Sequence, residues 1–383
     1  MKRPLELYLH IPFCVRKCEY CDFLSGPASD LVRSGYVEQL RQEILCQSAY
    51  YQGYEAVTVF LGGGTPSLLK EGEIAALMDT VHRCFSVSPE AEITIEANPG
   101  TVTLEKLQTY RACGINRISI GLQSADDREL KALGRIHTYG DFLKTYQRVR
   151  QAGFANVNVD LMSALPGQTM ASWKNTMKKT AMLKPEHISA YSLILEEGTP
   201  FYEKYHDHPE ALPGEDEERE MYYAAKAFLK EQGYERYEIS NYARRGYACR
   251  HNVGYWTGRE YLGLGLGASS YIQGCRFRNE PDLQKYSRIR MDGPEADEKL
   301  HLEMHPLTEK EQMEEFMFLG LRMMEGVSGS EFLERFGQNM WNVYGDVLKK
   351  LEANHLIVVE SPRVRLSEFG IDISNYVLSE FLL

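Results

Sequence analysis

The stretch Cys14-Val-Arg-Lys-Cys18-Glu-Tyr-Cys21 decides the fold of this chain. It follows the apolar residues 5–11, whose composition predicts a buried strand. Arg16, Lys17 and Glu19 stand between the cysteines, and charged residues of this kind mark a loop rather than a hydrophobic core. Three thiols in one polar loop at the end of a strand predict a metal or redox site.

The spacing of the cysteines separates two kinds of metal site. A structural zinc ion needs four protein ligands, and His10 is the candidate nearest to the triplet. An iron-sulfur cube held by three thiolates leaves one iron with an open position for another ligand. Cys14, Cys18 and Cys21 therefore favour a [4Fe-4S] cluster, with zinc as the alternative.

Strand-like and helical patterns alternate through the first half of the chain, which predicts an α/β fold around a parallel sheet. The predicted strands are residues 5–11, 56–61, 92–97, 117–121, 156–161 and 187–193, and helical patterns include residues 36–50, 73–85 and 171–183. Six units without the two-halved plan of a dinucleotide-binding fold predict an incomplete (β/α)6 barrel related to the TIM barrel. In such barrels the chemistry collects at the carboxyl ends of the strands.

The second half contains two changes in composition. Residues 205–220 predict a solvated loop that leads into a helix over 221–232, and residues 280–306 are more polar than the segment before them. We therefore predict a first domain over 1–280, a linker over 281–306 and a C-terminal domain over 307–383. In the last, helices over 309–324, 330–336 and 342–353 and two strands around Ser361-Pro362 predict a winged-helix-like domain, with Met317, Met323 and Met324 as core residues.

Composition narrows the range of partners. The chain has 383 residues, 43% of them hydrophobic and 25% charged, and a formal net charge of −11. This charge argues against nucleic acid as a partner, and no polybasic patch predicts membrane binding. The sequence has neither an apolar run of about 18 residues that would span a membrane nor the apolar stretch of a signal peptide. We therefore expect a cytoplasmic protein.

Five longer motifs carry a resemblance to a known family. They are Tyr8-Leu-His-Ile-Pro-Phe-Cys14, Gly62-Gly-Gly-Thr-Pro66, Gly114-Ile-Asn-Arg-Ile-Ser-Ile-Gly-Leu-Gln123, Asp160-Leu-Met-Ser-Ala-Leu-Pro-Gly167 and His251-Asn-Val-Gly-Tyr-Trp256. Together with the cysteine triplet they resemble the HemN/HemW group of the radical S-adenosylmethionine (SAM) superfamily, and its HemW branch most closely. The resemblance covers nearly the whole chain and implies a partial barrel of the radical SAM type with a HemN-type C-terminal domain.

The resemblance also implies cofactors and the residues that bind them. In this group the open iron of the cluster is chelated by the amino and carboxylate groups of SAM. The matching positions here are Tyr8, Tyr20, Gly63, Gly64, Thr65, Glu96, Gln123, Arg135, Asp160 and Ile194. Most of them follow successive predicted strands, so we expect them to line one pocket. No residue is assigned a catalytic role.

Glycine allows close approach of the backbone to a ligand, and each polar residue type suits part of SAM. Glu96 and Asp160 could accept hydrogen bonds from amino or hydroxyl groups, while Gln123 and Arg135 could bind a carboxylate.

Two functional classes remain within the group. HemN-like proteins are oxygen-independent coproporphyrinogen III dehydrogenases, whereas HemW-like proteins are haem chaperones that pass haem to acceptor proteins. Phe23 stands where the HemN pattern has a fourth cysteine. HemN-like proteins carry an extension before the cysteine triplet, whereas thirteen residues precede Cys14 here. Residues 251–256 match a segment of the HemW branch. These features favour a haem chaperone, with a porphyrinogen dehydrogenase or another radical SAM enzyme as the alternative.

His251 is the candidate residue for haem binding. A neutral imidazole is a common axial ligand of haem iron, and Tyr255 and Trp256 could offer flat apolar surfaces to the porphyrin. The alternative is a structural histidine held by its neighbours. The expected partners are haem, a haem-acceptor protein and an electron donor for the cluster. The sequence leaves open whether the chain forms a homodimer.

Overall fold

Six parallel strands lie side by side in chain order in the computed structural model, which describes residues 2–383. They are β1 (Arg3–Ile11), β2 (Tyr54–Gly63), β3 (Val87–Ala97), β4 (Arg117–Gln123), β5 (Val157–Ser163) and β6 (His187–Ser192). Every residue of β4 is buried, as expected for a parallel strand covered on both faces. The six strands predicted from the sequence are confirmed, with boundaries that differ by a few residues.

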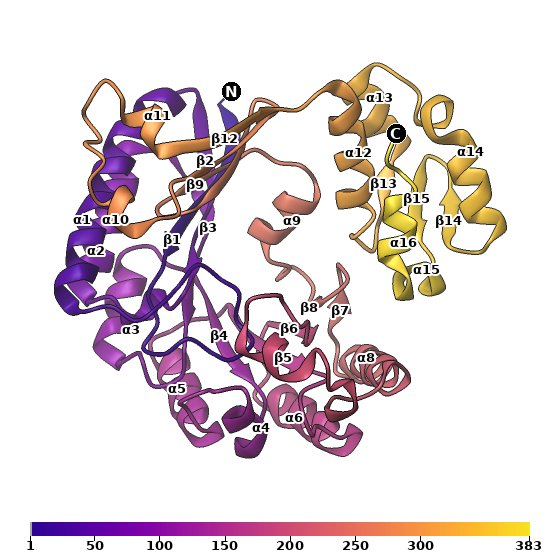
Figure 1. Cartoon of the computed structure of the whole chain (residues 1–383), viewed down its shortest axis with the longest axis horizontal. Helices are drawn as coiled ribbons and strands as arrows, with labels where there is room; N and C mark the ends of the chain where they lie inside the picture. The colour runs from indigo at the N-terminus through magenta and orange to yellow at the C-terminus, as the bar shows by residue number, and fades with distance from the viewer. Residues whose placement is uncertain (1) are drawn as a thin grey trace.

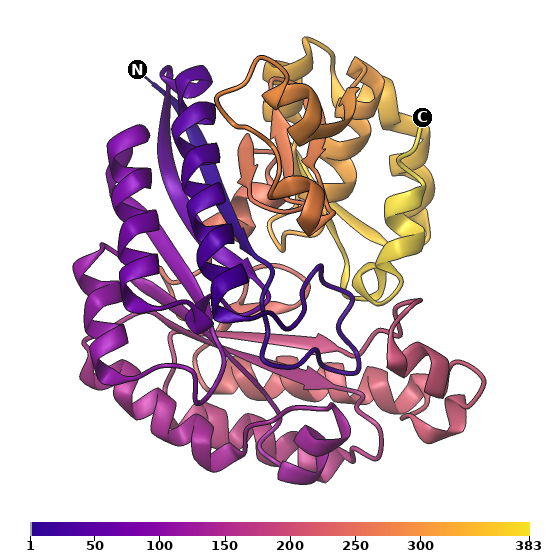
Figure 2. The same cartoon turned by 60° about the vertical axis from the view of Figure 1, so that its left-hand side comes forward.

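Helices cover the outer face of these strands, as Figures 1 and 2 show. They are α1 (Asp30–Gln47), α2 (Glu71–Cys84), α3 (Leu104–Ala112), α4 (Asp127–Ala132), α5 (Tyr139–Gln151) and α6 (Met170–Met182), with short 3-10 turns at Ser48–Tyr51 and Pro66–Leu68. Helix α1 begins earlier than predicted because the Ser29 side chain accepts a hydrogen bond from Val32 N at 3.3 Å and caps the helix.

The chain beyond β6 forms more regular structure than the sequence predicts. Its elements are α7 (Pro200–Tyr205), a 3-10 turn (Pro209–Ala211), α8 (Glu215–Glu231), β7 (Glu235–Arg236), β8 (Asn241–Ala243), α9 (Arg250–Trp256), β9 (Tyr261–Leu264), β10 (Ser269–Ile272), β11 (Cys275–Asn279), α10 (Leu283–Tyr286), α11 (Ala296–Leu300) and β12 (His301–Pro306). The loop predicted over 205–220 is wrong from Glu215 onward. Four acidic residues there form the first turn of α8, where the helix dipole favours negative charge.

The sheet stays open. Strand β9 pairs in parallel with β1, so the order is β12-β11-β10-β9-β1-β2-β3-β4-β5-β6-β8-β7. Strands β10 to β12 pair antiparallel on one side, and β8 pairs antiparallel with β6 on the other. Within residues 2–383 the edge strands β12 and β7 do not pair with each other, so the prediction of an incomplete barrel is confirmed.

The segment predicted as a linker, residues 281–306, is structured and packs against α1. Gln39 Nε2 donates hydrogen bonds to the carbonyl oxygens of Tyr286 (2.9 Å) and Ile289 (2.8 Å). Gln47 Nε2 donates to Asp297 Oδ1 at 2.7 Å. The end of the segment forms β12 at the edge of the large sheet. The domain boundaries themselves stay a prediction.

The C-terminal residues have a hydrophobic core of their own. Their elements are α12 (Glu309–Gly320), β13 (Val327–Ser328), α13 (Gly329–Phe336), α14 (Met340–Ala353), β14 (Ile357–Glu360), β15 (Arg363–Leu366), α15 (Glu368–Asp372) and α16 (Ser374–Ser379). The predicted winged-helix-like order of three helices and a hairpin is present, and β13 adds a third strand. Met317 is fully buried in this core, and Met324 packs against it. No helix in residues 2–383 is long and apolar enough to cross a membrane.

A buried carboxylate joins helix α1 to three later segments of the chain. Glu43 on α1 is fully buried and accepts hydrogen bonds from Gly265 N (3.0 Å), Asn279 Nδ2 (2.8 Å) and the Tyr286 hydroxyl (2.5 Å). Burial raises the pKa of Glu43 to about 7, and the hydrogen bonds act in the opposite direction. The residue thus ties α1 to β11 and to α10.

We expect Glu43→Ala to lower the free energy of unfolding by at least about 3 kcal/mol, since each buried donor left without a partner costs about 1–3 kcal/mol. Urea denaturation measures the change. The matched control is Glu38→Ala on the same helix, where an exposed ion pair with Arg41 is lost and a change below about 1 kcal/mol is expected. Equal effects of the two variants would contradict the structural role of Glu43.

Candidate cofactor-binding site

A cavity of about 350 Å³ lies at the carboxyl ends of the parallel strands. Of the residues that the sequence predicts as ligands, it is lined by Cys14, Cys18, Cys21, Tyr20, Gly63, Gly64, Glu96, Gln123, Arg135 and Asp160. These residues come from the ends of β1 to β5 and from the loops that follow them. The fold thus brings most of the predicted site into one pocket, as expected for a partial barrel.

The cysteine loop connects β1 to α1 and can be followed in Figure 2. Cys14 N donates to Gly26 O, and Gly26 N donates to Pro12 O, both at 3.0 Å, so the two ends of the loop are held together. The three thiols are half-buried and free of disulfides. Burial raises the pKa of Cys21.

The arrangement of the three thiols suits a cluster rather than a single metal ion. In residues 2–383 no three His, Cys, Asp or Glu side chains are arranged to hold a single metal ion. A [4Fe-4S] cube needs another arrangement, because each thiolate binds a different iron atom. Three free thiols around one cavity fit that need, and the open iron would face the polar groups of the same cavity.

Arg135 joins the cysteine loop to the sheet. Its Nη1 donates to Cys18 Sγ at 3.5 Å, and its Nη2 donates to Asn98 Oδ1 (2.6 Å) and to Gly121 O (2.7 Å). The guanidinium places a positive charge between the thiol and the ends of β3 and β4. Such a group stabilises a thiolate and can meet a carboxylate in the same cavity.

Two glycines let β2 approach the cysteine loop. Gly63 has a φ of +107°, and a Cβ atom there would lie 2.4 Å from the His10 ring. A Cβ atom on Gly64 would lie 2.7 Å from Phe13 O. Gly64 N donates to Ile11 O at 2.9 Å, so the backbone of β2 continues past β1 into the site. Any larger residue at these positions would push the end of β2 away from β1 and from the start of the cysteine loop.

Two carboxyl groups form the floor of the cavity. Glu96 accepts a hydrogen bond from Gly63 N at 3.0 Å, and Asp160 accepts from Ser119 Oγ (3.1 Å) and Asn158 Nδ2 (2.7 Å). Burial, and then the nearby Asp160, raise the pKa of Glu96 to about 8. Burial also raises the pKa of Asp160. A ligand with a positive charge or hydroxyl groups would stabilise both carboxylates.

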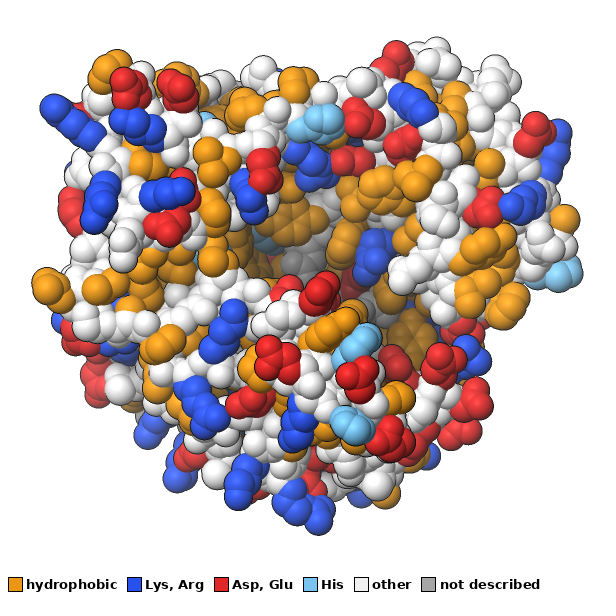
Figure 3. Space-filling model, viewed as in Figure 1, with side chains coloured by type: hydrophobic (Ala, Val, Ile, Leu, Met, Phe, Trp, Pro, Cys, Tyr) orange, Lys and Arg blue, Asp and Glu red, His pale blue; other side chains and the backbone are white. Residues whose placement is uncertain are grey.

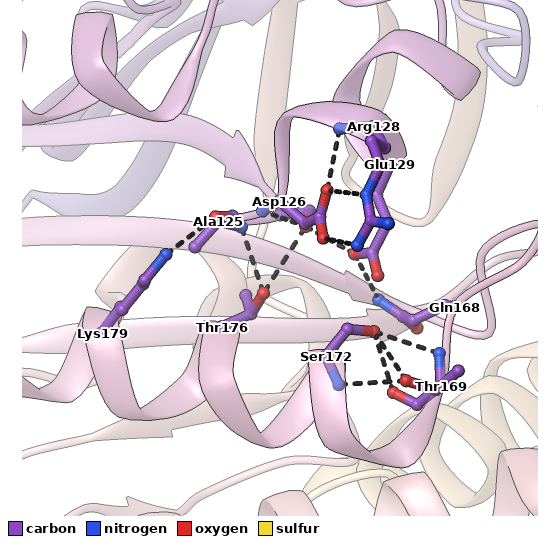
Figure 4. Close-up of polar contacts among 10 residues, drawn as sticks. Ala125, Asp126, Arg128, Glu129, Gln168, Thr169, Ser172, Thr176 and Lys179 are labelled. Carbon is purple, nitrogen blue, oxygen red and sulfur yellow. Dashed lines mark hydrogen bonds and ion pairs between the residues drawn. The ribbon is translucent and has the colours of Figure 1, made fainter.

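Gln123 lines the cavity in a left-handed conformation, with a φ of +69°. A non-glycine residue holds this conformation only where its surroundings fix it. A few residues further along the chain, Figure 4 shows Glu129 of α4 close to Gln168, which donates to the Glu129 carboxylate at 3.1 Å. Ser124 Oγ donates to the same carboxylate at 2.5 Å. This buried cluster joins the turn after β4, next to Gln123, to the turn after β5.

Three of the predicted SAM-site residues lie outside the cavity lining. Thr65 is buried beside it and donates from Oγ1 to Cys14 Sγ at 3.6 Å, so it supports the loop. The Tyr8 hydroxyl pairs with His10 Nδ1 at 2.9 Å, and Tyr8 lines a neighbouring cavity. Ile194 is 66% exposed, and its side chain does not line the pocket. Ile194 stands two residues past the end of β6, one residue after Leu193, whose N–H still donates to Ser163 O at the end of β5.

Other residues of the cavity were not found from the sequence. They include Asn98, which directly follows β3, Ser119 of β4 and Tyr191 of β6. Asn98 is the most informative, since its side chain joins Arg135 to Thr65 Oγ1, to which it donates at 2.7 Å. The signal that could have identified it is its place directly after the third predicted strand, beside Glu96.

His251 lies far inside the protein. The side chain is 2% exposed, and both ring nitrogens have partners: Nδ1 pairs with Thr58 Oγ1 at 2.7 Å and Nε2 pairs with the Tyr255 hydroxyl at 2.9 Å. Burial, and then Arg117 and Arg259, lower the pKa of His251 to about 3, so the ring is neutral. Neither nitrogen is available to haem iron in this arrangement, which favours the structural alternative. A role of His251 in haem binding stays a prediction.

Comparison with known proteins identifies the family. Residues 8–180 match the Radical SAM superfamily, and residues 307–373 match the HemN C-terminal domain. Heme chaperone HemW of Bacillus subtilis (strain 168) is 36% identical over 376 residues, which cover 98% of this chain and 98% of that protein. The chain belongs to the HemW family. Heme chaperone HemW of Lactococcus lactis subsp. lactis (strain IL1403) is 34% identical over 386 residues, covering 100% of this chain and 98% of that protein.

The fold is also that of a solved structure. Coproporphyrinogen III oxidase (HemN) from Escherichia coli, described as a radical SAM enzyme, superposes with a TM-score of 0.85 at 24% identity and covers 100% of this chain and 90% of that one. The resemblance stated from the sequence motifs is therefore confirmed, together with the fold class. Membership of the radical SAM superfamily implies a [4Fe-4S] cluster and SAM, which together supply radical chemistry when bound.

Replacing Cys14, Cys18 or Cys21 by Ser is expected to abolish most of the bound iron and sulfide, because each thiolate holds a different iron. Iron and sulfide are measured after anaerobic reconstitution of the full chain. Cys46→Ser is the control, since Cys46 packs on α1 against the hydrophobic core, away from the cavity. Full loading of any one of the three triplet variants would contradict the cluster assignment.

Glu96→Ala and Asp160→Ala are each expected to weaken SAM binding to the cluster-loaded protein by about tenfold or more, since a hydrogen bond to a charged group is worth about 1.5–3 kcal/mol. Isothermal titration gives the affinity. The control is Glu90→Ala, an exposed carboxylate at the other end of β3. Unchanged affinity in both cavity variants would remove these residues from the SAM site.

Proposed function

We propose that this chain is a haem chaperone, which binds haem and transfers it to acceptor proteins. The observation that carries the proposal is the similarity, over nearly the entire length, to two proteins named Heme chaperone HemW. Such coverage includes both the partial barrel and the C-terminal unit. A shared fold alone would not support a function, because one fold hosts many activities.

The cofactor site has two proposed parts. Cys14, Cys18 and Cys21 hold the [4Fe-4S] cluster, and the polar residues of the cavity hold SAM on its open iron. Arg135 and Gln123 would bind the carboxylate of SAM, and Glu96 and Asp160 would accept hydrogen bonds from its amino and hydroxyl groups. Three thiols on one loop and two carboxyl groups in the same cavity support this assignment. Tyr20, which packs against Phe201, would close one side.

Phe23 bears on the choice between carrier and enzyme. It occupies the position of a fourth cysteine in the HemN pattern, lines the cavity and is 58% exposed. Phenylalanine offers neither a proton nor a ligand at this place, whereas a cysteine could supply both. This difference favours a carrier over the alternative, an oxygen-independent coproporphyrinogen III dehydrogenase or another radical SAM enzyme.

The partners follow from the proposed function. A haem chaperone needs haem and a haem-acceptor protein, and a redox-active cluster needs an electron donor. We propose that the chain works in the cytoplasm. Its oligomeric state can be measured by sedimentation, which would detect a homodimer. For the domains we propose the limits 1–280 and 307–383, supported by separate hydrophobic cores in the two parts.

The full chain, loaded with its cluster under anaerobic conditions, is expected to bind ferric haem saturably and to leave coproporphyrinogen III unchanged in the presence of SAM and a reductant. Absorbance titration follows the haem, and chromatography of porphyrins follows the second substrate. Bound haem should leave the protein when a haem-free acceptor is added. Conversion of coproporphyrinogen III over many turnovers would replace the proposed function by the alternative.

A further inference from the structure

A second cavity, of about 760 Å³, adjoins the cofactor cavity, and Phe23, Gly63 and Glu96 contribute to both. Its lining includes residues of the cysteine loop, α9, β9, β11 and α12. The face in Figure 3 is hollowed at its centre, where α9 lies in Figure 1, and hydrophobic side chains gather around the hollow. The volume is within the range of about 300–1,000 Å³ that small-molecule and cofactor sites occupy.

The lining of this second cavity contains flat apolar groups from two parts of the chain. Tyr255 and Trp256 lie on α9, and Tyr255 packs edge-on against Tyr261 with ring centres 4.7 Å apart. The cysteine loop contributes Phe23 and Leu24, which are 58% and 41% exposed. Exposed large apolar side chains at the rim of a cavity indicate a surface that a ligand covers.

A cation lies in the same lining. Arg276 donates from Nε and Nη2 to the two carboxylate oxygens of Glu315 (2.7 and 2.8 Å) and from Nη1 to the Tyr261 hydroxyl (2.8 Å). These bonds fix the guanidinium in place and use three of its five N–H groups. The remaining N–H groups could bind a carboxylate at the edge of a planar ligand.

We propose that this second cavity is the haem site, with the macrocycle between Trp256 and Phe23 and a propionate at Arg276. The proposal rests on the proposed function and names the place where it is performed. Haem is a flat, largely apolar molecule with carboxylates on one edge, which suits aromatic walls and one guanidinium. Bound there, haem lies against the same loop that carries the cluster cysteines.

In this arrangement His251 is a positioning residue rather than an iron ligand. Its Nε2 pairs with the Tyr255 hydroxyl at 2.9 Å, and its ring stacks on Phe60 with centres 5.0 Å apart. The cavity lining contains Tyr255 but not His251. The histidine thus acts on haem through Tyr255, by fixing the orientation of the aromatic residues on α9.

The first test is a titration of the full chain with ferric haem, followed at the Soret band. Phe23→Ala and Trp256→Ala are expected to weaken binding at least tenfold. Phe369→Ala is the matched control, because Phe369 is 57% exposed and lies on α15, outside the cavity lining. Phe23 is exposed on a loop, so its variant keeps the test valid if Trp256→Ala fails to fold.

The outcomes distinguish the location of the haem site from the proposed function. Saturable binding by the parent chain and unchanged affinity in Phe23→Ala would overturn the location of the site and leave the proposed function standing. Absence of saturable binding by the parent chain would overturn the proposed function itself. An equal loss in Phe369→Ala would show general adhesion of haem to apolar surface and would also overturn the location.

The second test concerns His251. His251→Ala and Tyr255→Phe are expected to weaken haem binding by similar factors, with no further loss in the double variant, because both remove the same contact. The Soret maximum of the bound haem should stay that of the parent protein in both variants. A shifted maximum in His251→Ala, absent from Tyr255→Phe, would make the histidine an iron ligand and overturn its positioning role.

Discussion

Backbone pairing on both sides of β1 fixes the position of this strand, and the cysteine loop begins at its end. The strand pairs in parallel with β2 up to Ile11 and Gly63, and with β9 through Leu9 and Leu264. Its apolar side chains, including Leu9 and Ile11, are fully buried, so it can neither slide nor turn over without exposing them. The hydrogen bond from Gly64 N to Ile11 O carries the pairing beyond the strand. The cysteine loop therefore starts from a fixed point.

From that point the site is held together by polar groups that belong to different strands. Arg135 contacts Cys18, Asn98 and the backbone of β4, so one side chain links the loop with two strand ends. Asp160 is held by two neighbouring polar side chains on the same sheet. A buried polar group is costly without partners, and this requirement makes the arrangement specific as well as stable. The cofactor site is thus largely formed by the protein's own contacts.

The sequence predicts those parts of the structure whose residue pattern repeats or has a fixed spacing. Parallel strands buried on both faces are continuous apolar runs, so β1 to β6 could be located, and the cysteine triplet has a spacing of its own. Asn98 has no such signal, because a single polar residue after a strand is common. The burial of His251 depends on Thr58 and Tyr255, one of them far away in the chain, and no local pattern reports it.

Short strands and long-range polar contacts could not be predicted from the sequence either. Strands of two to five residues, such as β7 to β11, carry too few positions for a period to be recognised. The attachment of residues 281–306 to α1 depends on Gln39 and Gln47, and a glutamine side chain in a sequence gives no indication of the long-range hydrogen bonds that it makes.

The two hydrophobic cores are joined in part by ion pairs. Glu315 of α12 binds Arg276 of β11, and Glu368 of α15 contacts Lys226 and lies 3.5 Å from Arg236. Glu368 is 65% exposed, so its pairs are open to screening by dissolved salt. Ionic strength therefore acts on the seam between the two units more than on either core. The Arg276–Glu315 pair is different, because Glu315 is 17% exposed and Arg276 lines the second cavity, so salt weakens this contact less than it weakens the pairs of Glu368.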